Sequence, residues 1–333
     1  MFDFSSSPLL TRRSPGERSF GLIIEMLIVW GIAFFVPLIV GFIPGAVATV
    51  ILGINGFSEL LNDAVSSGIA GGAGTVDSEA VRALTERITE SEGYRLTELF
   101  GEAWTVAVAL FVCLAIQRRS LSTLGIERKG AAKRYAGGIL LGAVLCSATV
   151  LVTCLSRAAT FDGYRGNVNY LFLFFFLLGY VIQGAAEELL IHGLFMTTLA
   201  RRFRWLPSVL VSAAFFMLLH AVNAGVTFLS LLNVFLFGVF LGLFVIRTGS
   251  VLGAAALHTA WNFTEGHVFG CSVSGFPAAS GIFSVTFDAQ RAVTNGGAFG
   301  PEGGLGCTMI LMLSLIAVLF LPSLGGKRRG TNA

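Results

Sequence analysis

The stretch Gly184-Ala185-Ala186-Glu187-Glu188-Leu189-Leu190-Ile191-His192 decides how the rest of the chain is interpreted. It lies inside an apolar run from Tyr170 to Ala200, which is long enough to cross a membrane as a helix. One acidic side chain at the centre of a membrane helix costs about 2.5–3.5 kcal/mol. An acid in such a helix is therefore a candidate functional residue, and the adjacent pair Glu187 and Glu188 is a stronger one.

The composition of the whole chain agrees with a membrane protein. Of its 333 residues, 55% are hydrophobic and 12% are charged. An average soluble domain carries about 25% charged residues. The composition predicts an all-α fold, a polytopic transmembrane helical bundle. We expect an integral, multi-pass protein of a bacterial cell membrane, with membrane lipid as a partner and no nucleic acid.

The placement of basic residues predicts about eight spans, with the N- and C-termini cytoplasmic. Lysine and arginine gather in the N-terminal tail, after the second and fourth spans and at the C-terminus, as the positive-inside rule requires. The predicted organisation begins with a cytoplasmic tail over 1–20, the first membrane segment over 21–55 and a polar extracytoplasmic insertion over 56–99. Spans two and three follow over 100–168, and a core with the candidate site extends over 169–269. The chain then forms a glycine-rich loop over 270–304 and a last span with a basic tail over 305–333.

Two spans carry small residues at helical spacing. The third contains Gly138-x-x-x-Gly142 and the sixth contains Gly238-x-x-x-Gly242. Small residues four positions apart let two helix backbones approach closely in a membrane. We therefore predict ordinary close helix packing at both places.

Polar residues on three predicted spans indicate one buried cluster. Such groups are buried at least cost when they face one another inside a bundle. A carboxylate able to activate water, with imidazole and amide donors for an oxyanion, is what amide hydrolysis requires. The residues are Glu187, Glu188 and His192 on the fourth span, His220 at the end of the fifth, and His258 and Asn262 on the seventh. The fourth histidine, His267, is assigned to a loop without a role.

The same side chains also allow a metal site. Glu188 and His192 share one face of a helix, and with His220 and His258 they would offer one carboxylate and three imidazoles to zinc. The chain has no His-Glu-x-x-His motif, which weakens this signal. Two further interpretations are a polar network that only ties helices together and a proton-coupled transporter. No inverted repeat supports the transporter.

Three motifs, in their order and spacing, resemble those of the CPBP (Abi) family, which includes the CAAX prenyl endopeptidases. Here Glu187-Glu188-x-x-x-His192, Phe216-x-x-x-His220 and His258-x-x-x-Asn262 stand where that family has Glu-Glu-x-x-x-Arg, Phe-x-x-x-His and His-x-x-x-Asn or Asp. The resemblance implies an intramembrane endopeptidase that hydrolyses a peptide bond of a membrane-associated peptide or protein. It implies Glu187 as the general base, helped by His220, with His258 and Asn262 stabilising the oxyanion and Glu188 in support.

One residue departs from the family pattern. The family's arginine in the first motif is thought to hold the second glutamate as an ion pair, and His192 takes its place here. His192 can hydrogen-bond Glu188 but forms an ion pair only when it is protonated. The departure motivates an alternative, a non-catalytic membrane regulator or immunity-type protein on the same fold. The family is described both as metalloproteases and as metal-free glutamate enzymes, and the sequence leaves both open.

Overall fold

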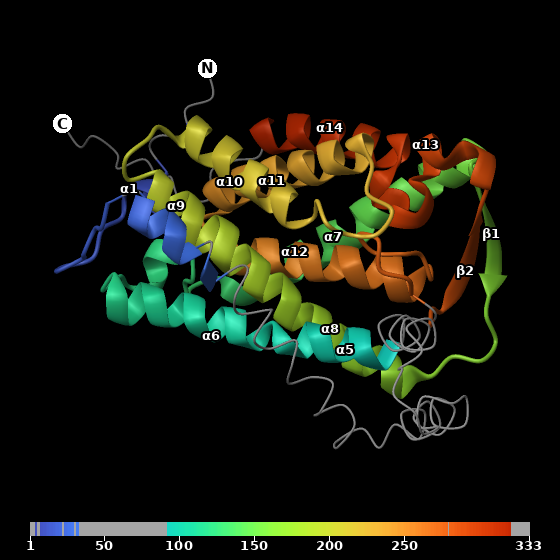
Figure 1. Cartoon of the computed structure of the whole chain (residues 1–333), viewed down its shortest axis with the longest axis horizontal. Coiled ribbons are helices and arrows are strands. Elements are labelled where there is room, and N and C mark those ends of the chain that lie inside the picture. Colours follow the sequence, from blue (N-terminus) through green and yellow to red (C-terminus); the bar gives the residue numbers. More distant parts are fainter. Residues whose placement is uncertain are drawn as a thin grey trace, which may run out of the picture.

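The computed structural model describes residues 4, 7–21, 23–29, 31–32, 92–278 and 280–320. They form a helical protein with one small sheet (Figure 1). The α-helices are α1 (Pro8–Thr11), α5 (Glu92–Gly101), α6 (Ala103–Phe111), α7 (Ala131–Leu155), α8 (Tyr170–Glu188), α9 (Met196–Leu199), α10 (Trp205–Leu219), α11 (Phe228–Thr248), α12 (Val251–Phe263), α13 (Ala292–Asn295) and α14 (Leu305–Phe320). The strands are β1 (Ala159–Tyr164) and β2 (Phe283–Phe287).

Several of these helices continue as π- or 3₁₀-helical turns. The π-helical turns are η2 (Val112–Ile116), η4 (Leu189–Phe195) and η5 (Thr264–Val268). They extend α6, α8 and α12, so each of these helices is longer than its α-helical part. The 3₁₀ turns are η3 (Leu121–Leu124), η6 (Ala289–Arg291), η7 (Gly297–Phe299) and η8 (Pro301–Gly303).

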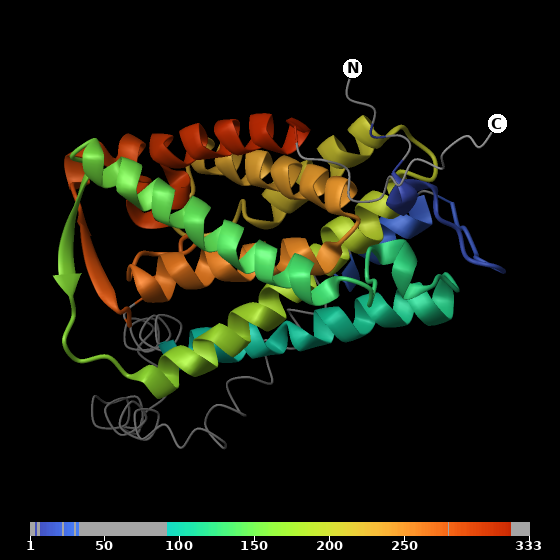
Figure 2. The ribbon, with the colours of Figure 1, turned by 180° about the vertical axis from the view of Figure 1, so that it is seen from behind.

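Helix α12 lies at the centre of the bundle. It packs against α7, α8 and α11, and nearly all of its residues are buried. Figures 1 and 2 show the long helices running roughly along one direction, with the sheet at the opposite end from α1. The motif residues of α12 are therefore surrounded by other helices and do not face the outer surface.

Glycines allow the close approach of α7 and α8 to α12. A Cβ atom built on Gly138 would lie 2.2 Å from the carbonyl oxygen of Gly253, and one on Gly142 would lie 2.1 Å from that of Leu257. On α8, a Cβ at Gly184 would lie 2.6 Å from Thr259 Oγ1. Close packing was predicted for the glycine motif of α7, and the structure confirms it. These contacts set the distance between the helices that carry the candidate site.

We expect Gly142→Ala to destabilise the protein by about 1–3 kcal/mol, because the added methyl group has no room against α12. The measurement is the thermal unfolding midpoint of purified protein in detergent. Gly137→Ala is the matched control, since nothing lies within 4 Å of a Cβ at Gly137 on the same helix. Equal midpoints for the two variants would contradict this account of the α7–α12 contact.

The membrane spans are confirmed in part. Among the described residues, four helical runs are long and apolar enough to cross a membrane, namely Glu92–Ile116, Ala131–Leu155, Tyr170–Leu199 and Phe228–Thr248. Two shorter apolar helices, Trp205–Leu219 and Leu305–Phe320, lie where the fifth and eighth spans are predicted. Most of the first predicted membrane segment, 21–55, and most of the 56–99 insertion lie outside the described residues. The count of eight spans and the side on which the termini lie stay predictions.

The segment predicted as a glycine-rich loop, 270–304, is folded and packed. Its strand β2 pairs antiparallel with β1, which lies more than a hundred residues earlier, with an irregularity between Phe161 and Gly163. A Cβ on Gly300 would lie 2.1 Å from Ser272 O, and one on Gly304 would lie 2.2 Å from Thr294 O. The glycines thus serve close packing in a compact cap at one end of the bundle, and the predicted all-α fold carries one two-stranded sheet.

Candidate active site

The two adjacent glutamates lie where α8 changes its helical geometry. Glu187 and Glu188 are the last α-helical residues, and the chain continues through the π-helical turn η4, which carries His192. A π-helical turn inside a helix is rare and is frequently found at functional sites. Every residue of η4 is buried.

Glu188 is completely buried and connects two helices. Its Oε2 atom lies 2.7 Å from Nδ1 of His192 on the next turn, and its Oε1 atom lies 3.0 Å from Nδ1 of His258 on α12. A buried carboxylate needs such partners, because an uncompensated charge in an apolar interior is strongly destabilising. Glu188 therefore fixes the position of α8 relative to α12.

His192 holds Glu188 through one ring nitrogen and α11 through the other. Its Nε2 atom lies 3.0 Å from the carbonyl oxygen of Gly238. Both ring nitrogens therefore face oxygen acceptors, and a carbonyl oxygen can only accept. A doubly protonated ring satisfies both contacts, with one N–H donated to Gly238 and the other to Glu188. In that form His192 pairs with the carboxylate as the family's arginine is thought to do.

Glu187 is the less enclosed of the two acids. Its side chain is 20% exposed, and Oε2 lies 3.9 Å from Nε2 of His258. This oxygen is buried and has no hydrogen-bond partner among the described residues. The distance to His258 is too long for a direct hydrogen bond and suits a bridge through one water molecule.

The other two predicted site residues flank this acid–imidazole group. His220, at the end of α10, lies with Nδ1 2.9 Å from the carbonyl oxygen of Phe216, so Nδ1 carries the proton and Nε2 can accept. Nδ2 of Asn262 donates a hydrogen bond to Oε1 of Gln183 at 3.1 Å. Gln183 lies on α8, one turn before Glu187. His220 and Glu187 make no direct hydrogen bond or ion pair.

A pocket beside the group links His220 to His258. Both histidines line it, together with the aromatic rings of Phe216, Phe237 and Trp261. Phe216 packs on both imidazoles, at ring-centroid distances of 4.6 Å to His220 and 5.9 Å to His258. The structure therefore brings together Glu187, Glu188, His192 and His258 by direct or near contact, with His220 across a shared pocket and Asn262 one turn along α12.

Two further acids near the site were not singled out from the sequence. The indole N–H of Trp261 points to Oε2 of Glu265 at 3.1 Å and to Oε1 of Glu302 at 2.8 Å. Glu302 also accepts from the backbone N–H and the hydroxyl of Ser274, and it lines the pocket with the two histidines. Glu265 lies three residues after Asn262, where helical periodicity offered a signal. Glu302 comes from the cap, and no local pattern connects it to α12.

His267 does not lie in a loop, as the sequence suggested. It belongs to η5 and is 1% exposed. Its ring stacks on Phe176 of α8 at a centroid distance of 4.0 Å, and Nδ1 lies 2.6 Å from the carbonyl oxygen of Ser280. Helix α12 continues through a π-helical turn beyond the predicted end of the span, which carries His267 into the interior.

The side chains predicted to bind zinc do not fit a metal as they lie here. Both ring nitrogens of His192 and both oxygens of Glu188 are engaged by other groups, so these two predicted ligands are not open to an ion, while His220 and His258 each keep only Nε2. Within the part of the chain that the structure describes, no group of three or more His, Cys, Asp or Glu side chains is placed to hold a metal ion. The mechanism proposed for this site therefore assigns no step to a metal ion.

Fold and site together define a helical membrane protein with a buried acid–imidazole cluster between α8, α10 and α12. Residues 169–264, from the residue before α8 to the residue after α12, match the model of the family described as type II CAAX prenyl endopeptidase Rce1-like. The match covers less than a third of the chain and agrees with the resemblance to the CAAX prenyl endopeptidases that the three motifs indicate. No curated protein and no solved structure matches the chain.

Proposed function

We propose that the protein is a membrane-embedded endopeptidase that hydrolyses a peptide bond of a membrane-associated substrate with a water molecule activated by Glu187. The observation that carries the proposal is the buried, unpartnered Oε2 of Glu187, 3.9 Å from Nε2 of His258. A carboxylate oxygen with no protein donor is free to accept a proton from water, as a general base does. The family match supports a peptidase of this class.

Glu187 and His220 would transfer the proton from the water molecule to the leaving amine. Glu187 takes a proton from water while the oxygen forms a bond to the carbonyl carbon, and the carbonyl oxygen becomes an oxyanion. The same proton then passes to the leaving amine as the C–N bond breaks. His220, whose Nε2 atom has a free lone pair, lies across the shared pocket and can assist this transfer.

Asn262 and His258 would stabilise the oxyanion. The side-chain amide of Asn262 has two N–H groups, of which one is donated to Gln183, so the other remains for a substrate oxygen. Glu188 holds Nδ1 of His258, which directs Nε2 toward the side of Glu187. Donors preset in this way stabilise negative charge that develops in the transition state.

The proposal is tested by incubating reconstituted full-length protein with a mixture of membrane-tethered peptides and identifying the products by mass spectrometry. We expect cleavage at a defined peptide bond, with incorporation of one oxygen from labelled water into the new carboxyl group. A protein that binds these peptides but cleaves none of them would contradict the assignment as a peptidase.

We expect this cleavage to be insensitive to metal chelation. Two of the four side chains predicted to bind zinc, Glu188 and His192, are fully engaged with other groups, which leaves only Nε2 of His220 and of His258 as open donors. The measurement is the cleavage rate before and after treatment with a strong chelator, with elemental analysis of the purified protein alongside. Stoichiometric zinc, together with a loss of activity that zinc restores, would contradict the metal-free mechanism.

A further inference from the structure

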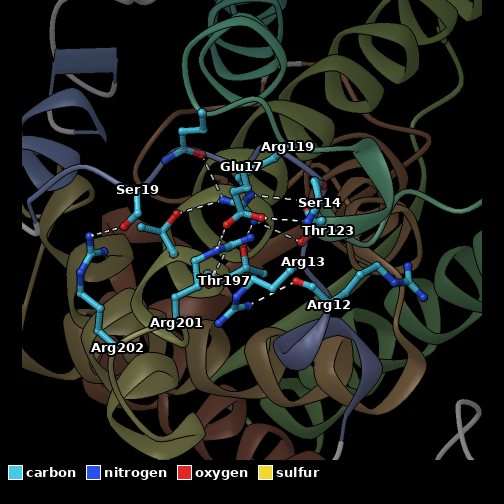
Figure 3. Close-up of polar contacts among 12 residues, drawn as sticks. Arg12, Arg13, Ser14, Glu17, Ser19, Arg119, Thr123, Thr197, Arg201 and Arg202 are labelled. Carbon is cyan, nitrogen blue, oxygen red and sulfur yellow. Dashed lines mark hydrogen bonds and ion pairs between the residues drawn. The ribbon is translucent and has the colours of Figure 1, made fainter.

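Three ion pairs connect the N-terminal segment to the arginine-rich end of the bundle. Glu17 in the N-terminal segment bonds Arg201 at 2.5 Å, Arg12 bonds Glu127 at 2.5 Å, and Glu25 bonds Arg202. Figure 3 shows the arginines of these pairs gathered around Glu17 with their neighbours. These contacts join the segment before residue 26 to the ends of the later helices. They neutralise three of the arginines.

Two arginines that line one cavity at this end form no ion pair with the described residues. Among the described residues, Arg13 donates to the backbone carbonyl oxygens of Leu10 and Arg12, each at 3.3 Å. The side chain of Arg204 makes no hydrogen bond or ion pair with the residues that the structure describes. Both arginines line the same open cavity. Two positive charges without an ion pair therefore face the same cavity.

A third cation adds to the positive field nearby. Arg119 is buried, and within the described part of the chain it bonds neutral oxygens, among them the hydroxyl of Thr198 and that of Thr197, which Figure 3 labels. Burial, with Arg201 as a like-charged neighbour, lowers the pKa of Arg119 to about 9, so the group stays protonated at neutral pH. This end of the bundle therefore carries more positive charge than the three ion pairs neutralise.

The cavity combines these charges with apolar walls. Besides Arg13 and Arg204 it is lined by a hydroxyl side chain and by apolar side chains, namely Thr11, Leu10, Ala200, Phe203 and Trp205. Its volume is about 380 Å³. That value falls within the range of roughly 300–1,000 Å³ typical of small-molecule sites. A ligand that suits it carries negative charge on one part and hydrocarbon on another.

The cavity lies near the ends of two candidate membrane spans, the level at which lipid headgroups are expected. Two candidate membrane spans end at Ile116 and Leu199, and α10 begins beside the cavity at Trp205. Tryptophan and arginine are the residues that favour the membrane–water interface. The first turn of α10 has no side-chain cap, so its free backbone N–H groups add to the donors at this place.

We propose that this cavity binds the phosphate group of an anionic glycerophospholipid. Arg13 and Arg204 contact the phosphate, and the apolar side chains contact the glycerol and the first carbons of the acyl chains. Guanidinium groups match phosphate oxygens in geometry as well as charge. Basic pockets between the ends of membrane helices are suited to such headgroups. This site is separate from the acid–imidazole group and does not depend on its chemistry.

The test measures lipid binding to delipidated full-length protein in a neutral detergent, by native mass spectrometry with phosphatidylglycerol and with phosphatidylcholine. We expect tighter binding of phosphatidylglycerol. The double variant Arg13→Gln, Arg204→Gln should weaken that binding about 30-fold, since each arginine near a membrane surface contributes about 1 kcal/mol. The single variant Arg204→Gln removes no contact within the described chain, and it should weaken binding about 5-fold without affecting the fold.

The matched control is Arg18→Gln with Arg118→Gln, which removes the same charge from two exposed arginines outside the cavity. It should leave phosphatidylglycerol binding unchanged. Equal weakening in both double variants would mean general charge attraction and would overturn the proposal. So would equal affinity for phosphatidylcholine. Inorganic phosphate that binds as tightly as phosphatidylglycerol would assign the site to a soluble phosphate ester instead.

Discussion

Replacing Glu187 by glutamine is expected to lower kcat for peptide cleavage by about 10²–10⁴-fold, the range in which a general base contributes. Glutamine keeps the size of the side chain but cannot take a proton from water. KM should change little, because the proposed role of Glu187 is in the chemical step. The measurement is a steady-state cleavage assay with a membrane-tethered peptide that the wild-type protein cuts.

Glu98→Gln is the matched control for this variant. Glu98 lies on α5 and pairs with Arg95 on its own helix, and within the described structure it makes no hydrogen bond or ion pair with the candidate site residues. We expect full activity from it. Activity retained by Glu187→Gln would contradict the proposed base. A biological phenotype retained without any activity would instead favour the non-catalytic regulator.

Replacing Glu188 by alanine is expected to destabilise the fold by about 3–5 kcal/mol, the usual cost of breaking a buried ion pair from one side. The change leaves two buried imidazoles, His192 and His258, without their carboxylate. The measurement is the free energy of unfolding in detergent. Where the variant still folds, its cleavage rate should also fall, because His258 loses the partner that orients it.

The adjacent residue supplies the control for the stability measurement. Glu187→Ala removes an oxygen that has no hydrogen-bond partner in the described structure, so it should leave the free energy of unfolding nearly unchanged. The two glutamates would then separate into a chemical and a structural role. Equal losses of stability would show that the contacts of Glu188 do not hold α8 and α12 together.

His192 bears on the choice between enzyme and regulator. The sequence raised the regulator because a histidine replaces the arginine of the first motif. In the structure the imidazole bonds both Glu188 and the backbone of α11, so the second glutamate is still held from its own helix. The departure from the family pattern therefore no longer favours an inactive protein.

Long apolar runs made the helices predictable, and helical periodicity placed Glu188 next to His192. The contact between Glu188 and His258 was harder to foresee, because it depends on how closely α8 and α12 approach. Glycines such as Gly184 permit that approach, and the spacing of motifs within one helix does not reveal it. The sequence predicted which polar residues would gather, and packing between helices decided which atoms meet.

The cap was the least predictable part. Glycine is common in loops, and the tract before α14 was interpreted as a glycine-rich loop. In the structure Gly300 and Gly304 lie where a Cβ would collide with neighbouring backbone. The same residue type serves flexibility in one context and tight packing in another. Glu302 reaches Trp261 only through this packing, so its place beside the pocket could not be read from its neighbours in the sequence.

The pairing of β1 with β2 bears on how the protein can be shortened. Strand β1 precedes α8, and β2 follows the turn that ends α12. Their pairing therefore connects the two ends of the segment that carries the three motifs. A fragment trimmed to 169–264, the limits of the family match, would lose both strands and the connection that their pairing makes. Expression fragments that start before Ala159 and extend past Phe287 keep it intact.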